Sequence, residues 1–307
     1  MKAMTLQTYG TAQDLELTDQ PDPKVAPGEV LVRVKAAGVN PVDWKVAEGL
    51  LDPVMESRFP MIPGWDVAGV VERVGFDAEE FAVGDEVFGY IRKDTAQLGA
   101  YAEKVSAHVR MLARKPASLD WEQAAGLPLA GLTAYQALER VAAGPGDTLL
   151  VHAAAGGVGS LAAQIAVARG VRVIGTAGEG NHDFLRGLGA EPVTYGEGLA
   201  DRVRAVAPDG VDAVLDCVGG DAVDVSLELL GDPGRLASIV AAEVTEHGGH
   251  YVWVRPDSGG LAALAALADE GRLTVSVAKV LPLAEAAESW RISREGHTRG
   301  KLVLRVD

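Results

Sequence analysis

The sequence predicts an α/β protein with two domains, one an all-β unit and the other a parallel sheet covered by helices. From Val30 to about Pro116, short apolar strands alternate with glycine-containing turns, which is typical of an all-β unit. From about residue 120 to residue 270, short apolar strands alternate with segments of helical spacing. After Gly271 the pattern is mixed again. We therefore expect residues 1–119 and 271–307 to form one domain, with residues 120–270 inserted as the other.

The all-β unit is expected to be barrel-like, because its strands are short and its turns are frequent. Its predicted strands are Leu31–Lys35, Val67–Val74, Glu86–Tyr90 and Tyr101–Val105. The later part of the chain is expected to add the strand Leu273–Val280, a helix near Leu283–Ser293 and the strand Lys301–Val306.

The inserted segment alternates strand and helix, the order that produces a doubly wound parallel sheet with helices on both faces. Apolar spacing predicts helices at Trp121–Ala124, Thr133–Ala142 and Leu161–Ala168. The predicted strands are Thr148–His152, Val171–Thr176, Val211–Asp216 and Leu236–Val240.

Composition and charge exclude several classes of protein. The first residues contain no apolar core of a signal peptide, and no apolar stretch reaches the ~20 residues that cross a bilayer. The single cysteine, Cys217, can form neither an internal disulfide nor a four-cysteine zinc site. A net charge of −15 without a Lys/Arg cluster disfavours nucleic acid as a partner. We expect a cytoplasmic protein that binds neither membrane nor nucleic acid.

The strongest motif is a glycine-rich turn, Ala153-x-x-Gly156-x-x-Gly159, which follows one predicted strand and begins a helix. Small residues let the backbone approach a pyrophosphate, and the helix N-terminus offers unpaired N–H groups to it. A second strand completes the βαβ unit, the context that this motif requires. The turn predicts a Rossmann dinucleotide site; its cofactor-binding residues are Ala154, Gly156, Gly157, Val158 and Gly159.

The end of the second strand bears on the choice between NADH and NADPH. An acidic residue there would hold the ribose 2′-OH and repel a 2′-phosphate, whereas this chain has Thr176-Ala177-Gly178. Glu179 comes two or three residues later, and no basic residue occupies the loop. We predict NADPH (NADP) as cofactor, with Thr176 and Asn181 near the phosphate. Asn181 has a second interpretation, the N-cap of a helix at Asp183–Leu188.

Five segments follow one another in an order that matches a known family. They are Ala37–Asp43, Pro63–Gly69, Gly84–Val87, Gly156–Gly159 and Gly296–Lys301. Together they resemble the medium-chain dehydrogenase/reductase superfamily, in its zinc-free quinone oxidoreductase (zeta-crystallin-like) and enone reductase branch. The resemblance implies a GroES-like β-barrel catalytic domain beside the Rossmann domain, with the active site in the cleft between the two.

Zinc chemistry is not expected in this chain. Zinc-dependent members of the superfamily carry Cys where this chain has Asn40, and Gly-His-Glu where it has Gly64-Trp65-Asp66. A catalytic zinc needs three protein ligands from Cys, His or Asp/Glu, and the six histidines are scattered without ligand spacing. His152, at the end of a strand, is interpreted as a hydrogen-bonded structural residue. We predict no metal.

The resemblance also implies roles for individual residues. Asn40 and Asp43 would line the cleft near the nicotinamide, with Lys45 two positions further on. Asp43 can equally be read as a cap residue, and Lys45 as a solvated lysine or an ion-pair partner of Asp43 or Glu48. Trp44 stands where many members have Tyr, so a phenolic proton donor is absent there. Further cofactor contacts are implied for Thr133, which is also readable as a buried helix residue, and for Tyr195, Cys217 and Val218.

These residues predict an NADPH-dependent reductase that transfers a hydride to a quinone or an α,β-unsaturated carbonyl compound without zinc. Without a Lewis acid, an electron-poor acceptor is the easier substrate. The alternatives are a zinc-independent alcohol or acyl-thioester reductase of the same fold, and a non-catalytic NADPH-binding sensor or structural protein. The segment His250–Arg255 predicts an exposed edge strand, and pairing it with its copy predicts a homodimer.

Overall fold

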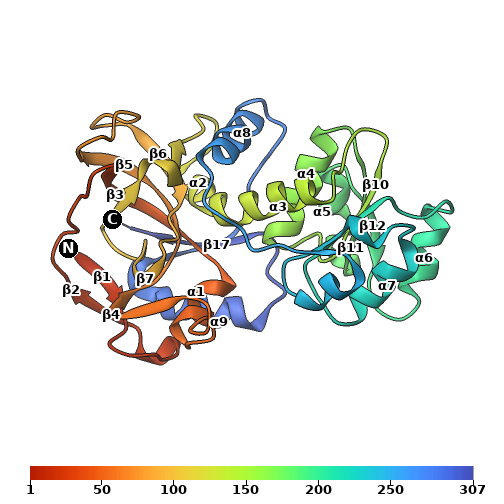
Figure 1. Ribbon diagram of the computed structural model, residues 1–307, viewed down its shortest axis with the longest axis horizontal. Helices are drawn as coiled ribbons and strands as arrows, with labels where there is room; N and C mark the ends of the chain where they lie inside the picture. Colours follow the sequence, from red (N-terminus) through yellow and green to blue (C-terminus); the bar gives the residue numbers. More distant parts are fainter. Residues whose placement is uncertain (307) are drawn as a thin grey trace. The chain divides into compact units, whose positions relative to one another are not determined.

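The computed structural model describes residues 1–306. Its contacts divide the chain into two compact units (Figure 1). Unit 1 consists of Met1–Leu132, Arg255–Asp269 and residues 275 to 306, and unit 2 consists of Thr133–Val254 and Glu270–Thr274. Unit 1 contains the antiparallel β structure and unit 2 a parallel sheet, which confirms the predicted fold class.

The two units differ from the predicted domain boundaries in two places. Residues 120–132 and 255–269, which we expected in the inserted domain, pack with unit 1. Helix α2 (Trp121–Gly126) lies against the β-strands of unit 1, and Asp269 at the end of α8 (Ser258–Asp269) accepts a hydrogen bond from the Ser118 backbone N–H at 2.9 Å. Alternation of strand and helix does not reveal which sheet a helix covers. Helix α3 (Pro128–Arg140) begins in unit 1 and continues into unit 2.

The main sheet of unit 1 is built around its longest strand, β3. The first half of β3 pairs with β8 and its second half with β17, and two register shifts interrupt its pairing with β5. A long, bent strand of this kind can pair with different neighbours along its two halves, which is how a sheet curves towards a barrel. The strand order is β16-β17-β3-β5-β6-β9, with bounds β3 Glu29–Val39, β5 Asp66–Val74, β6 Glu86–Tyr90, β8 Lys104–His108, β9 Leu112–Arg114, β16 Val277–Pro282 and β17 Lys301–Arg305.

One predicted strand of unit 1 is displaced. We expected Tyr101–Val105, but β8 begins at Lys104. The Tyr101 backbone bonds elsewhere, donating to the Pro63 carbonyl and accepting from the Met4 N–H, so it cannot join the ladder with β3. The remaining elements of unit 1 are the strands β1 Lys2–Thr5, β2 Glu16–Asp19, β4 Glu56–Ile62 and β7 Thr95–Leu98, and the helices α1 Pro41–Ala47 and α9 Ala286–Glu295.

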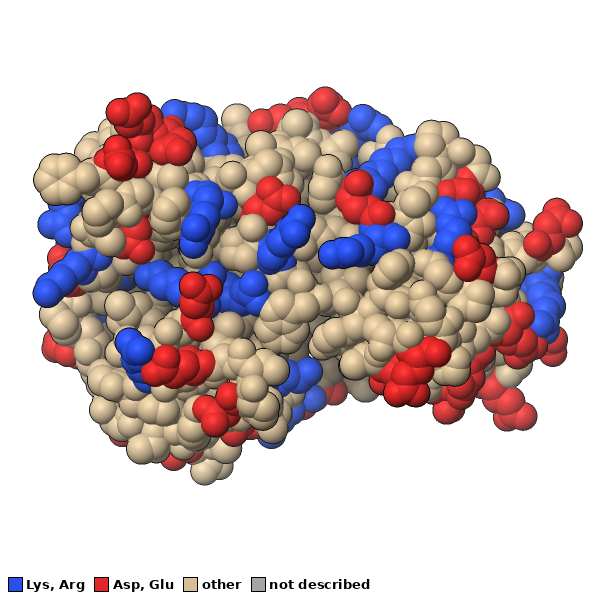
Figure 2. Space-filling view, in the orientation of Figure 1, with Lys and Arg blue, Asp and Glu red and all other residues tan. Residues whose placement is uncertain are grey.

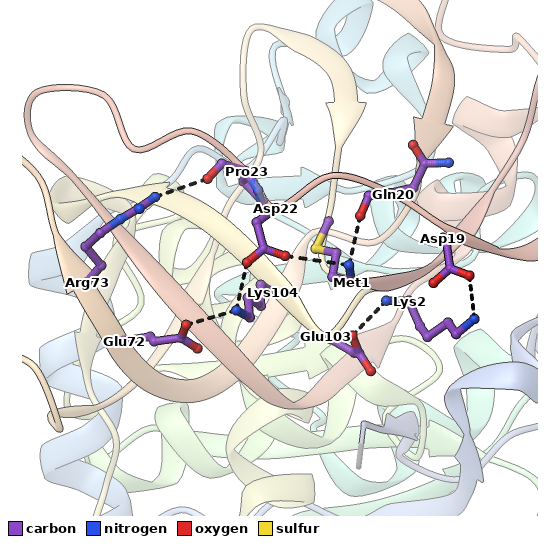
Figure 3. Close-up of polar contacts among 10 residues, drawn as sticks. All are labelled: Met1, Lys2, Asp19, Gln20, Asp22, Pro23, Glu72, Arg73, Glu103 and Lys104. Carbon is purple, nitrogen blue, oxygen red and sulfur yellow. Dashed lines mark hydrogen bonds and ion pairs between the residues drawn. The ribbon is translucent and has the colours of Figure 1, made fainter.

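Ion pairs connect β1 to β2, and connect the segment after β2 to the barrel wall (Figure 3). The Lys104 ammonium of β8 lies 2.8 Å from Asp22 and 2.9 Å from Glu72. Lys2 of β1 pairs with Asp19 of β2 at 2.7 Å. The carboxylates are exposed and the Lys104 side chain is half-buried, and each such pair contributes about 1 kcal/mol or less.

Unit 2 contains a six-stranded sheet in which every pair is parallel. Its order is β12-β11-β10-β13-β14-β15. From β10 the chain adds β11 and β12 on one side, and it then returns to add β13, β14 and β15 on the other side, so the strand order reverses beside β10. In open α/β sheets, ligands bind at the carboxyl ends of the strands at this reversal. The strands are β10 Thr148–Val151, β11 Arg172–Ala177, β12 Glu191–Thr194, β13 Ala213–Asp216, β14 Leu236–Ser238 and β15 His250–Tyr251; the helices are α4 Gly157–Ala168, α5 His182–Gly187, α6 Leu199–Val206 and α7 Asp221–Leu229.

Short 3₁₀ segments connect these elements at Ala12–Asp14, Val109–Met111, Glu179–Asn181, Pro233–Arg235, Ala242–His247 and Leu283–Glu285. Within residues 1–306, none of the helices has both the length and the apolar character to cross a bilayer. Basic side chains are interspersed with acidic ones over the face in Figure 2, which shows no continuous basic patch.

Candidate active site

The glycine turn of unit 2 connects β10 to α4. Ala153 adopts a left-handed conformation with φ of 50°, and its carbonyl accepts the Gly156 N–H at 2.9 Å. Gly156 is the N-cap of α4, without a side chain to cap it. The N–H groups of Gly157, Val158 and Gly159 form the first turn, which has no intrahelical acceptors and attracts anions.

Close packing explains the glycine at position 159. A Cβ there would lie 2.5 Å from the Ala153 carbonyl oxygen and 2.7 Å from the Ala154 Cα. The helix can therefore start this close to the strand only without a side chain at 159. At Gly156, by contrast, a Cβ would meet only the Ala153 carbonyl oxygen, at 3.3 Å. The backbone at Gly156 is therefore more open than the backbone at Gly159.

Thr176, at the end of β11, supports the same turn. It is buried, its Oγ1 accepts the Ala153 N–H at 3.1 Å, and its carbonyl accepts the Ala154 N–H at 2.9 Å. Its hydroxyl thus positions the turn. The next residues are more open: a Cβ at Gly178 would meet only Tyr195, at 3.9 Å, and Tyr195 is 57% exposed.

Asn181 precedes helix α5, as the capping interpretation expected. Its side chain makes no capping hydrogen bond, so the capping interpretation has only the position in its favour. Its backbone N–H donates to the Gly178 carbonyl at 2.9 Å.

The end of β13 carries a buried carboxylate, Asp216. Its oxygens accept the N–H groups of Val218 and Gly219 and the Ser238 hydroxyl, the last at 2.6 Å. These bonds shape the turn that presents Cys217 and Val218; Val218 is 57% exposed. Thr133, on α3, is buried.

His152 is a structural residue, as predicted. It is buried, and its Nε2 lies 3.0 Å from the Ser226 hydroxyl, which itself donates to the Ala222 carbonyl. Burial lowers the pKa of His152 to about 4, against a smaller opposing effect of Asp216. The imidazole is therefore neutral at pH 7.

In unit 1, Asn40 and Asp43 lie in one buried polar cluster at the start of α1. Pro41 occupies the first helical turn, and the Asp43 carboxylate accepts the Asn40 backbone N–H at 2.8 Å. Asp43 is thus a cap residue, which confirms that interpretation. Its Oδ2 also accepts the Tyr101 hydroxyl at 2.8 Å, and Trp290 Nε1 donates to the Tyr101 oxygen at 3.4 Å.

The Asn40 amide joins two charged residues of the cluster. The Lys301 ammonium donates to Asn40 Oδ1 and to the Val39 carbonyl, while Asn40 Nδ2 donates to Asp66 Oδ2 at 2.9 Å. Because an ammonium only donates and a carboxylate only accepts, these partners fix the orientation of the amide. Asp66 Oδ1 accepts the Leu129 N–H at 2.8 Å. Asn40, Asp43, Asp66 and Lys301 are each no more than 5% exposed.

Burial dominates the ionisation of this cluster. It raises the pKa of Asp43 to about 7; hydrogen bonds from Asn40 and Tyr101 oppose the rise, and the nearby Asp66 adds to it. Burial also raises the pKa of Asp66, to about 6, against the attraction of Lys301. The pKa of Lys301 is lowered by burial and raised in part by Asp66 and Asp43.

Lys45 lies outside this cluster. It is half-buried, and its ammonium lies 5.6 Å from the centre of the Trp44 ring. Glu48, one of its two expected ion-pair partners, pairs with Arg294. Trp44 is half-buried too; its indole N–H donates to Ser293 at 3.3 Å, and the Arg294 guanidinium lies 4.5 Å from its ring.

Within the part of the chain that the structure describes, no group of three His, Cys, Asp or Glu side chains is arranged to hold a metal ion. At the two positions compared with zinc-dependent enzymes, Asn40 supplies an amide to the buried cluster. Trp65 supplies an indole that packs 6.2 Å from the Tyr90 ring.

Comparison with known proteins identifies the family. Residues 26–117 match the model described as alcohol dehydrogenase GroES-like domain, and residues 188–304 match that described as zinc-binding dehydrogenase. The chain is 33% identical to the NADPH-dependent alkenal/one oxidoreductase, chloroplastic, of Arabidopsis thaliana, over 99% of this chain and 79% of the relative. The chain belongs to the medium-chain dehydrogenase/reductase superfamily.

Solved structures of this superfamily agree with the assignment. The quinone oxidoreductase of Coxiella burnetii superimposes with a TM-score of 0.88 at 34% identity, covering 100% of this chain and 99% of the other. A mycobacterial protein complexed with NADPH superimposes with a TM-score of 0.85 at 32% identity, covering 99% and 100%. The chain is therefore an oxidoreductase-family protein related to quinone and alkenal/one reductases.

Sequence reasoning missed several members of the buried cluster. Asp66, Tyr101, Trp290 and Lys301 join Asn40 and Asp43, although Asp66 and Lys301 had been noted only as parts of motifs. Lys301 carried a usable signal: it directly precedes the apolar run Leu302–Leu304 in a predicted strand. A charged residue in such a position indicates a buried partner.

Proposed function

We propose that this protein is an NADPH-dependent reductase of quinones or α,β-unsaturated carbonyl compounds that works without zinc. The observation that carries the proposal is the nature of the side chains at positions 40 and 65. An amide and an indole there cannot act as the thiolate and imidazole that hold a catalytic zinc. An acceptor that is already electron-poor is then the suitable substrate, which agrees with the relatives named as quinone and alkenal/one oxidoreductases.

The glycine turn is proposed to hold the dinucleotide. The first turn of α4 would bind the pyrophosphate, and Gly178, Asn181 and Tyr195 would surround a 2′-phosphate, for which the open position at Gly178 leaves room. Thr133, Cys217 and Val218 are proposed to line the remainder of the cofactor site. When bound, the nicotinamide supplies a hydride; the protein supplies orientation and electrostatics.

Cofactor choice can be tested at position 178. Gly178 has an ordinary extended backbone, so another residue fits there without strain. Gly178→Asp introduces a carboxylate that should lower kcat/KM for NADPH at least tenfold and spare NADH, whereas the control Gly178→Ala should change neither. A wild type that uses NADH as well as NADPH would contradict the proposed preference.

Among unit 1 residues, Lys45 is proposed to stabilise the negative charge that builds on the acceptor oxygen. Removal of one such donor typically lowers kcat about 10²–10³-fold. Lys45→Met keeps the aliphatic stem and removes the charge, so folding and NADPH binding should be retained. A fall of less than about threefold in kcat with an enone would remove this role.

One assay tests the reaction itself. Purified protein is given NADPH and a panel of quinones, enones, alcohols and acyl thioesters, with and without a chelator. We expect turnover with quinones or enones that the chelator leaves intact. Tight NADPH binding without turnover on any substrate would instead favour a sensor or structural protein.

The protein is proposed to be a homodimer. Strand β15 lies at the edge of the unit 2 sheet, as predicted, but is only the pair His250–Tyr251, shorter than the expected His250–Arg255. An exposed edge strand is a pairing surface. Sedimentation should give twice the 32.0 kDa chain mass; a monomer at micromolar concentration would contradict it. A cytoplasmic location stays a prediction.

A further inference from the structure

The two oxygens of the Asp43 carboxyl group have different surroundings. Oδ2 accepts two hydrogen bonds, from the Asn40 backbone N–H and from the Tyr101 hydroxyl, both at 2.8 Å. Oδ1 has none, and within residues 1–306 it is the one buried side-chain nitrogen or oxygen without a partner. An unpaired buried polar atom is costly, so its retention calls for an explanation.

A small, partly open cavity is lined in part by Asp43. It measures about 10 Å³, about the room that one water molecule needs. Its lining includes the side chains of Val46, Met61 and Trp65, and Gln97 of β7 provides an amide beside the Asp43 carboxyl group. A carboxyl group and an amide provide the two polar partners that a buried water requires.

Charge balance locates a proton in this cluster. The charged or titratable groups around Asp43 are Asp66 of β5, Lys301 of β17 and the phenols of Tyr101 and Tyr90, with Arg92 beyond Tyr90. Burial raises the pKa of both phenols, so they stay neutral at pH 7. One ammonium then faces two carboxyl groups. If both were ionised, the buried cluster would carry an uncompensated negative charge.

The hydrogen bonds decide which carboxyl group holds the proton. Both oxygens of Asp66 receive an N–H, from Asn40 and Leu129, and the Asn40 amide connects Asp66 to Lys301. Asp66 is therefore the site for the negative charge. Asp43 Oδ2 is occupied by two donors, which leaves Oδ1 as the only oxygen able to bear a hydrogen.

We propose that Asp43 holds a proton on Oδ1 in near-neutral solution, that this Oδ1–H donates to a single water in the cavity beside Gln97, and that this acid supplies the proton consumed in the reduction. The first two statements are independent of the reaction; the third rests on the proposed function.

The acceptor gains one hydride and one proton. The Asp43 O–H bond breaks, its electron pair stays on the carboxylate, and the proton passes through the cavity water to the reduced acceptor. The carboxylate then takes a proton from solvent before the next turnover. Asp66, already fully hydrogen-bonded, does not take part in this transfer.

Infrared spectroscopy of the full chain tests where the proton lies. At pH 7, where Asp66 is mostly ionised, the wild type should show the C=O stretching band of a protonated carboxylic acid, shifted on H/D exchange and lost towards pH 9. Asp43→Asn should abolish this band. The matched control Asp201→Asn, which changes an exposed carboxylate on α6, should leave the band intact. Absence of the band from the wild type at pH 7, or its survival in Asp43→Asn, would overturn the proposal.

Kinetics test the use of the proton. With a quinone or enone, wild-type kcat should fall as pH rises through about 7, the pKa to which burial raises Asp43. Asp43→Asn, which keeps both hydrogen bonds to Oδ2, should lower kcat about 10²-fold or more and remove this pH dependence. An unchanged pH profile in a folded Asp43→Asn protein would overturn proton supply by Asp43.

The two tests fail separately. A wild type that turns over no acceptor removes the proposed function and with it the proton-supply role. The infrared band still reports on the neutral acid in that case. A missing band together with normal turnover removes the neutral acid and leaves the proposed function intact.

Discussion

Two buried aspartates, Asp216 in unit 2 and Asp43 in unit 1, show how differently a protein can treat the same side chain. Asp216 is surrounded by neutral donors, and both of its oxygens accept hydrogen bonds from its own turn and from Ser238. Asp43 belongs to a cluster with a second carboxyl group and an ammonium, and one of its oxygens has no partner. A fully satisfied carboxylate holds backbone in place, whereas an incompletely satisfied one is a group whose protonation can change.

The largest expected effect comes from removing the ammonium. Lys301→Met leaves the carboxyl groups of unit 1 buried without their cation, and breaking a buried charge cluster in this way costs about 3–5 kcal/mol. Urea unfolding measures the loss. The control Lys279→Met, at an exposed position of the adjacent strand β16, should change stability by less than about 0.5 kcal/mol. If Lys301→Met and Lys279→Met lowered stability equally, the Lys301 ammonium would not stabilise the cluster. Asp43 would then not differ from Asp216 in needing a cation.

The next effect is the pH dependence that Asp43 confers. Its folded-state pKa, raised to about 7, lies above the ordinary value of 3.8, so between these values the folded protein binds the proton and the unfolded chain does not. The stabilisation is full below pH 3.8 and is lost as pH rises to about 7.

Wild type should therefore lose up to about 4 kcal/mol relative to Asp43→Asn between pH 4 and pH 7. Unfolding free energies of the two proteins at several pH values measure the difference, in which titrating groups remote from Asp43 cancel. A difference independent of pH would place Asp43 in the same class as Asp216.

A smaller loss is expected at Asp216 itself. Asp216→Asn puts an amide N–H₂ where a carboxylate oxygen accepted a hydrogen bond, so at least one buried donor of the turn loses its acceptor. The cost is about 1–3 kcal/mol. At pH 8, Asp43→Asn should by contrast be neutral or stabilising. Denaturation of both variants at that pH compares the sites directly, and a stabilised Asp216→Asn would contradict the structural role.

The smallest expected effect is a shift of the Asp43 pKa when its hydrogen bond from Tyr101 is removed. Tyr101→Phe removes a hydrogen bond that lowers the Asp43 pKa, so the midpoint of the infrared titration should move to higher pH. Loss of the bond should cost about 1 kcal/mol. A midpoint that moves down, or stays, would show that the Tyr101 hydroxyl does not act on this carboxyl group.

Much of the fold could be predicted because it follows from local patterns. Strand and helix alternation predicted the parallel sheet, and the spacing of Gly156 and Gly159 predicted a tight turn between a strand and a helix, which the structure has between β10 and α4. The boundaries of unit 1 could not be predicted, since α2 and α8 have apolar faces that fit either sheet. The displaced start of β8 depended on hydrogen bonds from Tyr101 to residues far away in sequence.

The candidate site was predicted only where its residues share a motif. Asn40 and Asp43 are three residues apart, so one segment indicated both. Their charged partners come from β5 and β17, and no spacing in the sequence links Asp43 to Lys301. What decides the chemistry, one carboxyl oxygen with donors and one without, depends on tertiary packing.

The position of Lys301 also affects how the protein is made. Lys301 bonds to Asn40 across 261 residues. During synthesis, Asp43 and Asp66 therefore leave the ribosome long before Lys301 does. Until then, the barrel wall must hold two acidic groups that cannot be buried together at low cost. A polypeptide terminated before residue 301 would lack this ammonium together with the strand β17 that carries it, so its two buried aspartates would have no cation beside them.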